Sequence, residues 1–210
     1  MTYMLNGKMG HKDSVGNEGI IEDGGLQWMN AGKGIIHEEM PMQTKGQMRG
    51  FQLWVNLPAS EKMSAPGYAD IPSKDVPEVS IGSSSMARVL AGNLNGQEGA
   101  VSTQAVKPQF FDIHLHADDT IDVPTSSHHN GFVYVYEGHV DIAGKTLRKG
   151  QLGVLDFADA LTLQSNENTK LIIVSGEPIN EPVVQYGPFV MNTEAEIKQA
   201  LHDYQNGTLA

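Results

Sequence analysis

The stretch GFVYVYEGHV, residues 131 to 140, alternates aromatic or β-branched residues up to a glycine and then resumes. Similar short segments recur along the chain between turn residues, among them FQLWVNL (51–57), FFDIHL (110–115) and LIIVSG (171–176). The chain has 23 glycines, many of which separate such segments. Short, β-branched and aromatic segments at this spacing are typical of an antiparallel sandwich or barrel. The sequence therefore predicts an all-β protein.

The same pattern occurs near the start of the chain, which indicates an internal repeat. YMLNGKM (3–9) and YVYEGHV (134–140) share the order aromatic, apolar, polar, glycine, apolar. Each is followed by a glycine that restarts a strand, in GGLQWM (24–29) and KGQLGVL (149–155). Two copies of one β unit are the simplest explanation. If Gly25 is aligned with Gly150, His37 falls opposite Thr162, so only the first copy carries a metal-ligand type there.

Two further features divide the chain. The segment 57–78 holds four prolines among polar residues and reads as a connection, which predicts a first domain at 1–72 and a second at 73–210. A short helix is expected at the C-terminus. Thr193 and Glu196 form a capping box there, followed by apolar positions at helical spacing and then by Gly207.

Composition limits the chemistry. There are no cysteines, so any metal must be held by His, Asp or Glu. The net charge of −11 and the lack of a Lys/Arg cluster exclude direct nucleic-acid binding through phosphate neutralisation. No apolar run approaches the length of about 18 residues needed to cross a membrane, and the first residues lack the pattern of a signal peptide. We expect a cytoplasmic protein that acts away from membranes.

Three long segments resemble the pirin family of two-domain cupins: TYMLNGKMGHKDSVGNEG (2–19), LQWMNAGKGIIHEEMP (26–41) and EPVVQYGPFVMNT (181–193). The resemblance extends over almost the whole chain. It implies two jelly-roll β-barrels, with a metal site in the N-terminal cupin domain and none in the C-terminal one.

In that family the metal is bound by a His-Pro-His stretch, a third histidine and a glutamate two residues later. The last pair corresponds to His37 and Glu39. Residues two apart on a strand share a face, so both side chains point to one ion while Glu38 points away. Without thiolates the donors suit iron, which the resemblance favours, or another divalent metal such as nickel, copper or manganese.

The His-Pro-His stretch does not occur in the sequence. Counting back twelve residues from Gly7 passes Met1, so we expect the first cupin domain to be N-terminally truncated and its metal site incomplete. At the same spacing before Gly138 the second copy has Pro124, Thr125 and Ser126, which are poor ligands. For His37 and Glu39 the structural alternative is a buried hydrogen-bonded pair.

The other histidines fit simpler roles. His114 and His116 are spaced as a polar strand face, and His11 falls in a charged hairpin. His128 and His129 lie in a turn-like run, where neighbours cannot face one ion, and His139 and His202 have no acid at useful spacing. Ser83, Ser84 and Ser85 lack the G-x-S-x-G pattern of a serine hydrolase.

Three functions follow from the resemblance. The first is a quercetin 2,3-dioxygenase, which opens a flavonol with O2, with Glu39 as metal ligand and catalytic base; two ligands alone predict weak or no activity. The second is a non-catalytic protein-binding regulator of transcription or of metabolic enzymes. In the third, the chain is a remnant, and the strand edges exposed by the truncation make it self-associate.

Overall fold

The computed structural model describes residues 1–42, 44–103 and 105–209. Contacts divide the chain into two compact units. One comprises Met1–Asp75 together with the segment from Ile179 onward, and the other comprises Val76–Pro178. Each unit is built mainly of antiparallel strands, as the sequence predicts, and each is described separately below.

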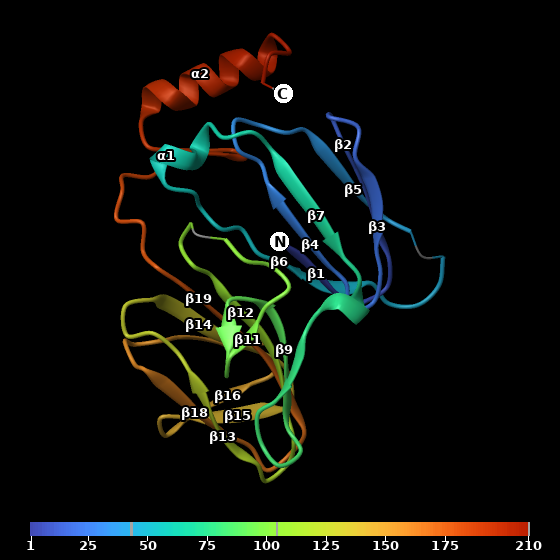
Figure 1. The fold of residues 1–210 in the computed structure, drawn as a ribbon, viewed down its shortest axis with the longest axis vertical. Coiled ribbons are helices and arrows are strands. Elements are labelled where there is room, and N and C mark those ends of the chain that lie inside the picture. Colours follow the sequence, from blue (N-terminus) through green and yellow to red (C-terminus); the bar gives the residue numbers. More distant parts are fainter. Residues whose placement is uncertain (43, 104, 210) are drawn as a thin grey trace. The chain divides into compact units, whose positions relative to one another are not determined.

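In the described part of its first 75 residues, the first unit contains two sheets (Figure 1). One has the strand order β6-β1-β4-β7 and the other the order β3-β2-β5. Their strands are β1 (Thr2–Asn6), β2 (Met9–Asp13), β3 (Glu18–Ile21), β4 (Leu26–Asn30), β5 (His37–Pro41), β6 (Arg49–Gln52) and β7 (Gly67–Ile71). A short helix, α1 (Ala59–Lys62), and a 3-10 turn, η1 (Ser73–Asp75), complete the first 75 residues.

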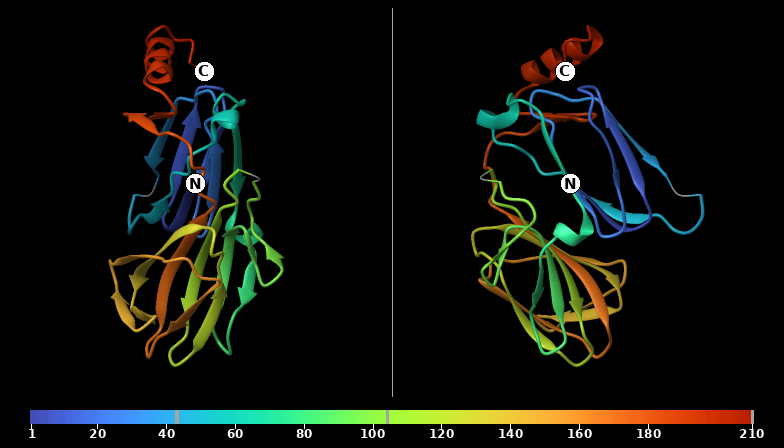
Figure 2. Two further views of the ribbon diagram at one scale, coloured as in Figure 1. Left: turned by 90° about the vertical axis from the view of Figure 1, so that its left-hand side faces the viewer. Right: turned by 45° about the vertical axis from the view of Figure 1, so that its right-hand side comes forward.

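The second unit is a sandwich of a six-stranded sheet, in the order β17-β14-β19-β12-β9-β8, and a four-stranded sheet, in the order β13-β18-β15-β16 (Figure 2). Apolar residues from both sheets form its core. Its strands are β8 (Glu78–Ser80), β9 (Met86–Ala91), β12 (Gln109–Leu115), β13 (Thr120–Pro124), β14 (Asn130–Glu137), β15 (His139–Ile142), β16 (Lys145–Arg148), β17 (Leu152–Val154), β18 (Ala160–Gln164) and β19 (Thr169–Gly176), with a small hairpin of β10 (Asn93–Leu94) and β11 (Gln97–Glu98).

Both units contain the repeat. β1 and β14 are each followed by a glycine of positive φ, Gly7 at 93° and Gly138 at 72°, and the hairpins β2–β3 and β15–β16 come next in the same register. That register places Gly24 (φ 71°), not Gly25, opposite Gly150 (φ 83°). The sequence alignment is therefore wrong by one residue. Gly24 and Gly25 are adjacent, and the sequence does not show that Gly24 is the one in the left-handed conformation.

The C-terminal helix α2 (Glu194–Gln205) begins with the predicted capping box, in which the Thr193 hydroxyl accepts from the Glu196 amide. The helix contacts the hairpin of β20 (Val184–Tyr186) and β21 (Phe189–Met191). Contacts group these elements with the first unit, whereas the sequence predicts a second domain at 73–210. Among the described residues, no helix is long and apolar enough to span a membrane.

Candidate functional site in the first unit

His37 and Glu39 lie on the face of β5 that corresponds to a core face in the second unit. The shared register sets β5 opposite β18, and it places His37 opposite Leu161 and Glu39 opposite Leu163. The expected match of His37 with Thr162 is corrected by the same one-residue shift. Leu161 and Leu163 are 7% and 0% exposed in the core of the second unit. In the first unit this face carries an imidazole and a carboxylate instead.

The carboxylate of Glu39 reaches the opposite sheet. Its Oε1 accepts a hydrogen bond from the Thr2 hydroxyl at 3.1 Å, and its Oε2 accepts one from Nε2 of Gln52 at 2.7 Å. Glu39 is half-buried, whereas His37 and Glu38 are exposed. The side chain of Glu39 is therefore held between the sheets by two donors. The side chain of His37, on the same face, has no comparable clamp among the described contacts.

His11 is a further polar residue of this interior that the sequence analysis missed. It belongs to the β2–β3 hairpin, as expected, but its side chain is only 4% exposed, and it lies directly across from Glu39 in the β2–β5 pair. Its Nε2 is hydrogen-bonded to the Tyr68 hydroxyl, which donates to Oδ2 of Asp70 at 2.5 Å. Gln27 donates to the other oxygen of Asp70 at 3.1 Å. This chain of hydrogen bonds joins the two sheets.

Burial, together with the hydrogen bond to Asp70, raises the pKa of Tyr68 well above its usual value. The phenol therefore remains protonated throughout the physiological range. Because its proton is given to Asp70, the hydroxyl oxygen is free to accept, and Nε2 of His11 is the donor of their hydrogen bond. The Tyr68 hydroxyl, whose proton goes to Asp70, fixes the tautomer of the buried His11 in this way.

Asp13 lies across from His37 in the same strand pair. Burial acts to raise its pKa, but the hydrogen bonds from the side chain and amide of Asn17 and from the amide of Val15 outweigh it and lower the pKa. The Asp13 carboxylate is thus occupied in holding the β2–β3 turn. It is not directed at a ligand.

The interior of the first unit differs in chemistry from that of the second. The second unit fills the space between its sheets with an aliphatic and aromatic cluster. The first unit places polar side chains on its facing sheets instead: Thr2, His11, Asp13, Gln27, His37, Glu39, Gln52, Tyr68 and Asp70. Four of them, Thr2, His11, Asp13 and Gln27, are buried, and burying polar groups costs free energy unless they are satisfied, so packing alone does not account for this choice. The first unit is therefore the candidate functional site.

A pocket of about 400 Å³ opens beside Glu39. Three methionines and a phenylalanine give it apolar walls, and Glu39 and Gln52 give it a polar side; its lining is Thr2, Met4, Met9, Glu39, Met48, Arg49, Gly50, Phe51 and Gln52. Neither Trp28 nor Trp54 lines this pocket. Apolar walls with a few convergent polar groups are typical of small-molecule sites.

The donor set of one chain is too small for a resident metal ion. Across residues 1–42, 44–103 and 105–209, no three His, Asp or Glu side chains are grouped so that they could hold one. His37 and Glu39 supply two donors, and Nε2 of His11 is engaged by Tyr68. Two donors leave most of the coordination sphere to water. Within one described chain, the residues therefore do not fit a bound metal.

The histidines of the second unit have local partners. Nε2 of His114 lies 3.3 Å from Oδ2 of Asp112, which also accepts from the Tyr136 hydroxyl at 2.6 Å through Oδ1. Nδ1 of His129 lies 3.4 Å from the Ser175 hydroxyl, and burial lowers the pKa of His129. We expected His114 to lie on a solvated face of β12. Its contact with Asp112 shows that this face is not simply a solvated surface.

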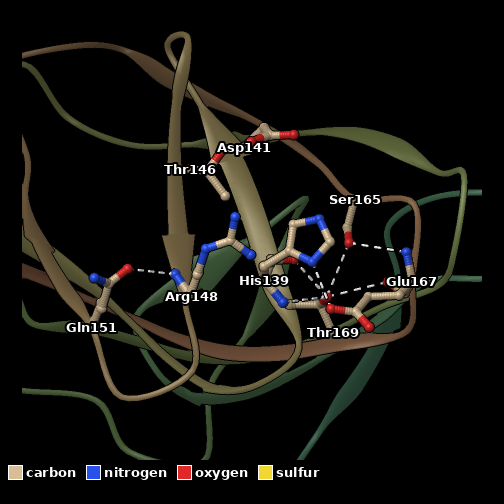
Figure 3. Close-up of polar contacts among 8 residues, drawn as sticks. All are labelled: His139, Asp141, Thr146, Arg148, Gln151, Ser165, Glu167 and Thr169. Carbon is tan, nitrogen blue, oxygen red and sulfur yellow. Dashed lines mark hydrogen bonds and ion pairs between the residues drawn. The ribbon is translucent and has the colours of Figure 1, made fainter.

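His139 also has a partner that the sequence spacing did not reveal (Figure 3). Its Nδ1 lies 2.5 Å from Oε1 of Glu167. The Thr169 hydroxyl donates to the His139 carbonyl at 2.6 Å, and the Ser165 hydroxyl lies 3.1 Å from the Thr169 hydroxyl. The expectation that His139 lacks a nearby acid is wrong, because Glu167 is brought in from the β18–β19 turn. The cluster ties that turn to β15 and has no donor set for a ligand.

Family models also divide the chain in two, but they place the segment from Ile179 onward with the C-terminal domain, whereas contacts place it with the first unit. The Pirin family model matches residues 1–55, and the model of the Pirin C-terminal cupin domain matches residues 110–210. A Pseudomonas aeruginosa protein with the provisional name of a quercetin 2,3-dioxygenase is 43% identical over 100% of this chain and 76% of its own length. A pirin-like protein of Caulobacter vibrioides is 42% identical, with 99% and 75% covered.

Solved structures show the same fold. A crystal structure of a quercetin 2,3-dioxygenase from Acinetobacter baumannii superposes with a TM-score of 0.94 at 35% identity and covers 100% of this chain and 75% of that one. A bacterial pirin from Escherichia coli, in complex with nickel(II), gives a TM-score of 0.68 at 18% identity, covering 84% and 71%.

Proposed function

Since the chain belongs to the pirin family, we propose that its first unit carries part of a quercetin 2,3-dioxygenase site to which His37 and Glu39 contribute. The observation that supports this most is the exchange of two core leucines of the second unit, Leu161 and Leu163, for an exposed imidazole and a half-buried carboxylate at the corresponding positions of the first. A fold that needed only a stable core would keep an apolar residue at the position of Glu39.

The substrate that suits the pocket is a flat aromatic molecule with hydroxyl groups, of the flavonol type. Methionine side chains adapt to flat apolar rings, and three of them, Met4, Met9 and Met48, line the pocket beside Phe51. Glu39 is held in place by Thr2 and Gln52, so a carboxylate oxygen is oriented toward a ligand hydroxyl without further side-chain ordering.

We expect a dilute, monomeric chain to bind metal weakly and to have little or no dioxygenase activity. Iron is the metal we expect, and a divalent ion with two protein donors competes poorly with water and buffer. Glu39 remains the candidate for the base that accepts the flavonol proton.

The test is made on dilute protein that sedimentation shows to be monomeric. Quercetin binding is measured by calorimetry, bound iron after anaerobic loading by elemental analysis, and quercetin loss in air by absorbance. We expect measurable quercetin binding that Glu39→Ala weakens and Glu18→Gln does not, with iron far below one ion per chain. Absence of quercetin binding would refute the substrate class. One tightly held iron per monomer with rapid turnover would refute the weak-activity proposal.

A further inference from the structure

The second unit has a pocket of its own, at the end of its sandwich where β12 and β14 begin. The pocket has a volume of about 270 Å³, and it shares no lining residue with the pocket beside Glu39. All of its described lining belongs to the second unit: Gly92, Asn93, Glu98, Ser102, Thr103, Lys107, Pro108, Gln109 and His129. Nothing in the proposed dioxygenase role accounts for this pocket.

The apolar core of the second unit gives way to polar residues at this end. Phe111 of β12 lies opposite Ile173 of β19, and both belong to the core. Two residues further along the same face of these strands, Gln109 lies opposite Ser175. Ser175 is only 6% exposed. The mouth of a β-sandwich or barrel is a common place for a small-molecule site, and here it carries buried hydrogen-bonding groups.

A chain of hydrogen bonds fixes which atoms these side chains can offer to a ligand. The Ser175 hydroxyl donates to Oε1 of Gln109 at 2.7 Å, and Nδ1 of His129 lies 3.4 Å from the same hydroxyl oxygen. A hydroxyl has one proton, so Nδ1 of His129 is the donor toward Ser175. Burial lowers the pKa of His129, which keeps the ring neutral near pH 7 and makes its Nε2 an acceptor. Among the described contacts, this Nε2 and the amide nitrogen of Gln109 bond no other residue.

The charged residues of the lining already have partners. Nζ of Lys107 lies 2.8 Å from Oε1 of Glu177, and Oε1 of Glu98 accepts from the Asn93 side-chain amide at 2.8 Å. A phosphate or carboxylate ligand would have to compete with Glu177 for Lys107, and it would also be repelled by Glu98. A neutral ligand avoids both costs. The described lining contains no aromatic side chain, which disfavours a flat aromatic ligand.

The backbone at one wall of the pocket holds an unusual conformation. Val106 and Lys107 have φ of 50° and 39°, in the left-handed region that a β-branched residue rarely adopts. The Glu177 amide donates to the Val106 carbonyl at 2.7 Å, and the ion pair of Glu177 with Lys107 adds a second tie. Strained backbone of this kind persists where its surroundings enforce it, and it clusters at ligand sites. Here it directs the chain into Pro108 and Gln109 of the lining.

We propose that this pocket binds a small, neutral, polyhydroxylated molecule of the monosaccharide class. A single ligand hydroxyl can donate to Nε2 of His129 and accept from the amide nitrogen of Gln109, which neither an ether nor a carboxylate can do. Further hydroxyls can donate to Oε2 of Glu98 and accept from the hydroxyls of Ser102 and Thr103. At about 30 Å³ for each water molecule, the pocket equals roughly nine waters, which is room for one sugar ring.

The test uses the full chain and four neutral probes: D-glucose, D-galactose, D-mannose and myo-inositol. Saturation-transfer NMR detects binding, and titration calorimetry gives the dissociation constant. We expect at least one probe to bind with a dissociation constant in the millimolar range or below, equally well at low and at high salt because no ion pair forms. Binding of none of the four would overturn the proposal. Tighter binding of inorganic phosphate or of glucose 6-phosphate than of the neutral probes would also overturn it.

Variants test whether the sugar occupies this pocket. His129→Phe keeps a ring of similar size but removes both nitrogens, and we expect it to weaken sugar binding at least about tenfold. His128→Phe, at the exposed neighbouring position, is the matched control and should leave the dissociation constant unchanged. Glu98→Ala removes an acceptor at an exposed position without disturbing a buried residue, and it should weaken binding about threefold or more. Circular dichroism checks that each variant is folded. Binding that is unchanged in both His129→Phe and Glu98→Ala would overturn the site.

This proposal and the proposed function fail in different ways. Saturating sugar should leave quercetin binding unchanged, because the two pockets share no residue. Displacement of quercetin by sugar would place the sugar beside Glu39 and would overturn the inference. Absence of quercetin binding in a chain that binds sugar would count against the proposed function alone.

Discussion

At the scale of single residues, Asp119 shows how this chain satisfies a charge with local donors. Its carboxylate accepts from the hydroxyls of Ser83 and Ser85 at 2.5 and 2.6 Å and from the Ser84 amide at 3.2 Å. These bonds lower the pKa of Asp119 to about 2. The three serines therefore hold a carboxylate and are not poised as nucleophiles, in line with the missing hydrolase pattern.

This arrangement makes stability depend on pH in acid. Because the pKa of Asp119 is lower in the folded than in the unfolded chain, its contribution is present above the ordinary value of 3.8 and is lost as pH falls toward 2. We expect urea unfolding to show Asp119→Asn less stable than the natural protein near neutral pH, with the difference shrinking between about pH 4 and pH 2. Asp156→Asn, at an exposed position, is the control. A difference that grows in acid would contradict this.

The polar interior shows what sequence spacing reveals and what it leaves out. His37 and Glu39 are two residues apart on a strand, so their shared face follows from the pleat alone. The tie between His11 and Tyr68 spans 57 residues, and no local pattern predicts such a pairing. His139 and Glu167 are likewise 28 residues apart. Local periodicity therefore gives the shared face of the two residues that the family resemblance singles out, and only the folded topology finds the residues that surround them.

At the scale of elements, α2 is the part that the sequence predicts best. Its capping box depends on residues three apart, and both halves of it are present in the structure. The partner of the helix was less accessible to prediction, because it follows from a hairpin that packs with the first unit. An amphipathic pattern indicates that a helix packs against another element, but it does not indicate which element.

The cap predicts a measurable stability change. Thr193→Ala removes the hydroxyl that accepts from the Glu196 amide, and we expect it to lower the free energy of unfolding by about 1 kcal/mol. Urea unfolding of the variant measures this loss. Thr44→Ala, at an exposed loop position, serves as the matched control and should be neutral. A neutral result for Thr193→Ala would show that the cap bond adds nothing over water.

At the scale of the whole molecule, two units of one architecture carry different interiors. The second unit has a continuous apolar core, whereas the first has polar side chains on its facing sheets and a pocket beside Glu39. Hydrophobic burial is the main stabilising term in folding. The second unit should therefore be the more stable of the two.

Unfolding should show this difference directly, since both tryptophans, Trp28 and Trp54, lie in the first unit. We expect the change in tryptophan fluorescence to occur at a lower urea concentration than the concentration at which the far-ultraviolet circular dichroism signal stops changing. Leu163→Ala, at a fully buried site of the second unit, should cost about 2–5 kcal/mol and move only the later transition. Coincident transitions by both probes would contradict independent units.

The return of the C-terminal segment to the first unit has a consequence for biosynthesis. Glu181 accepts from the Ala59 amide at 2.7 Å, and Lys62 donates to the Val190 carbonyl at 2.8 Å. A ribosome releases residues 76–178 as one uninterrupted stretch before the last of these partners has been made. The later unit in the chain can therefore finish folding first. The first unit stays incomplete, with its α1 side uncovered, until the segment from Ile179 onward has been translated.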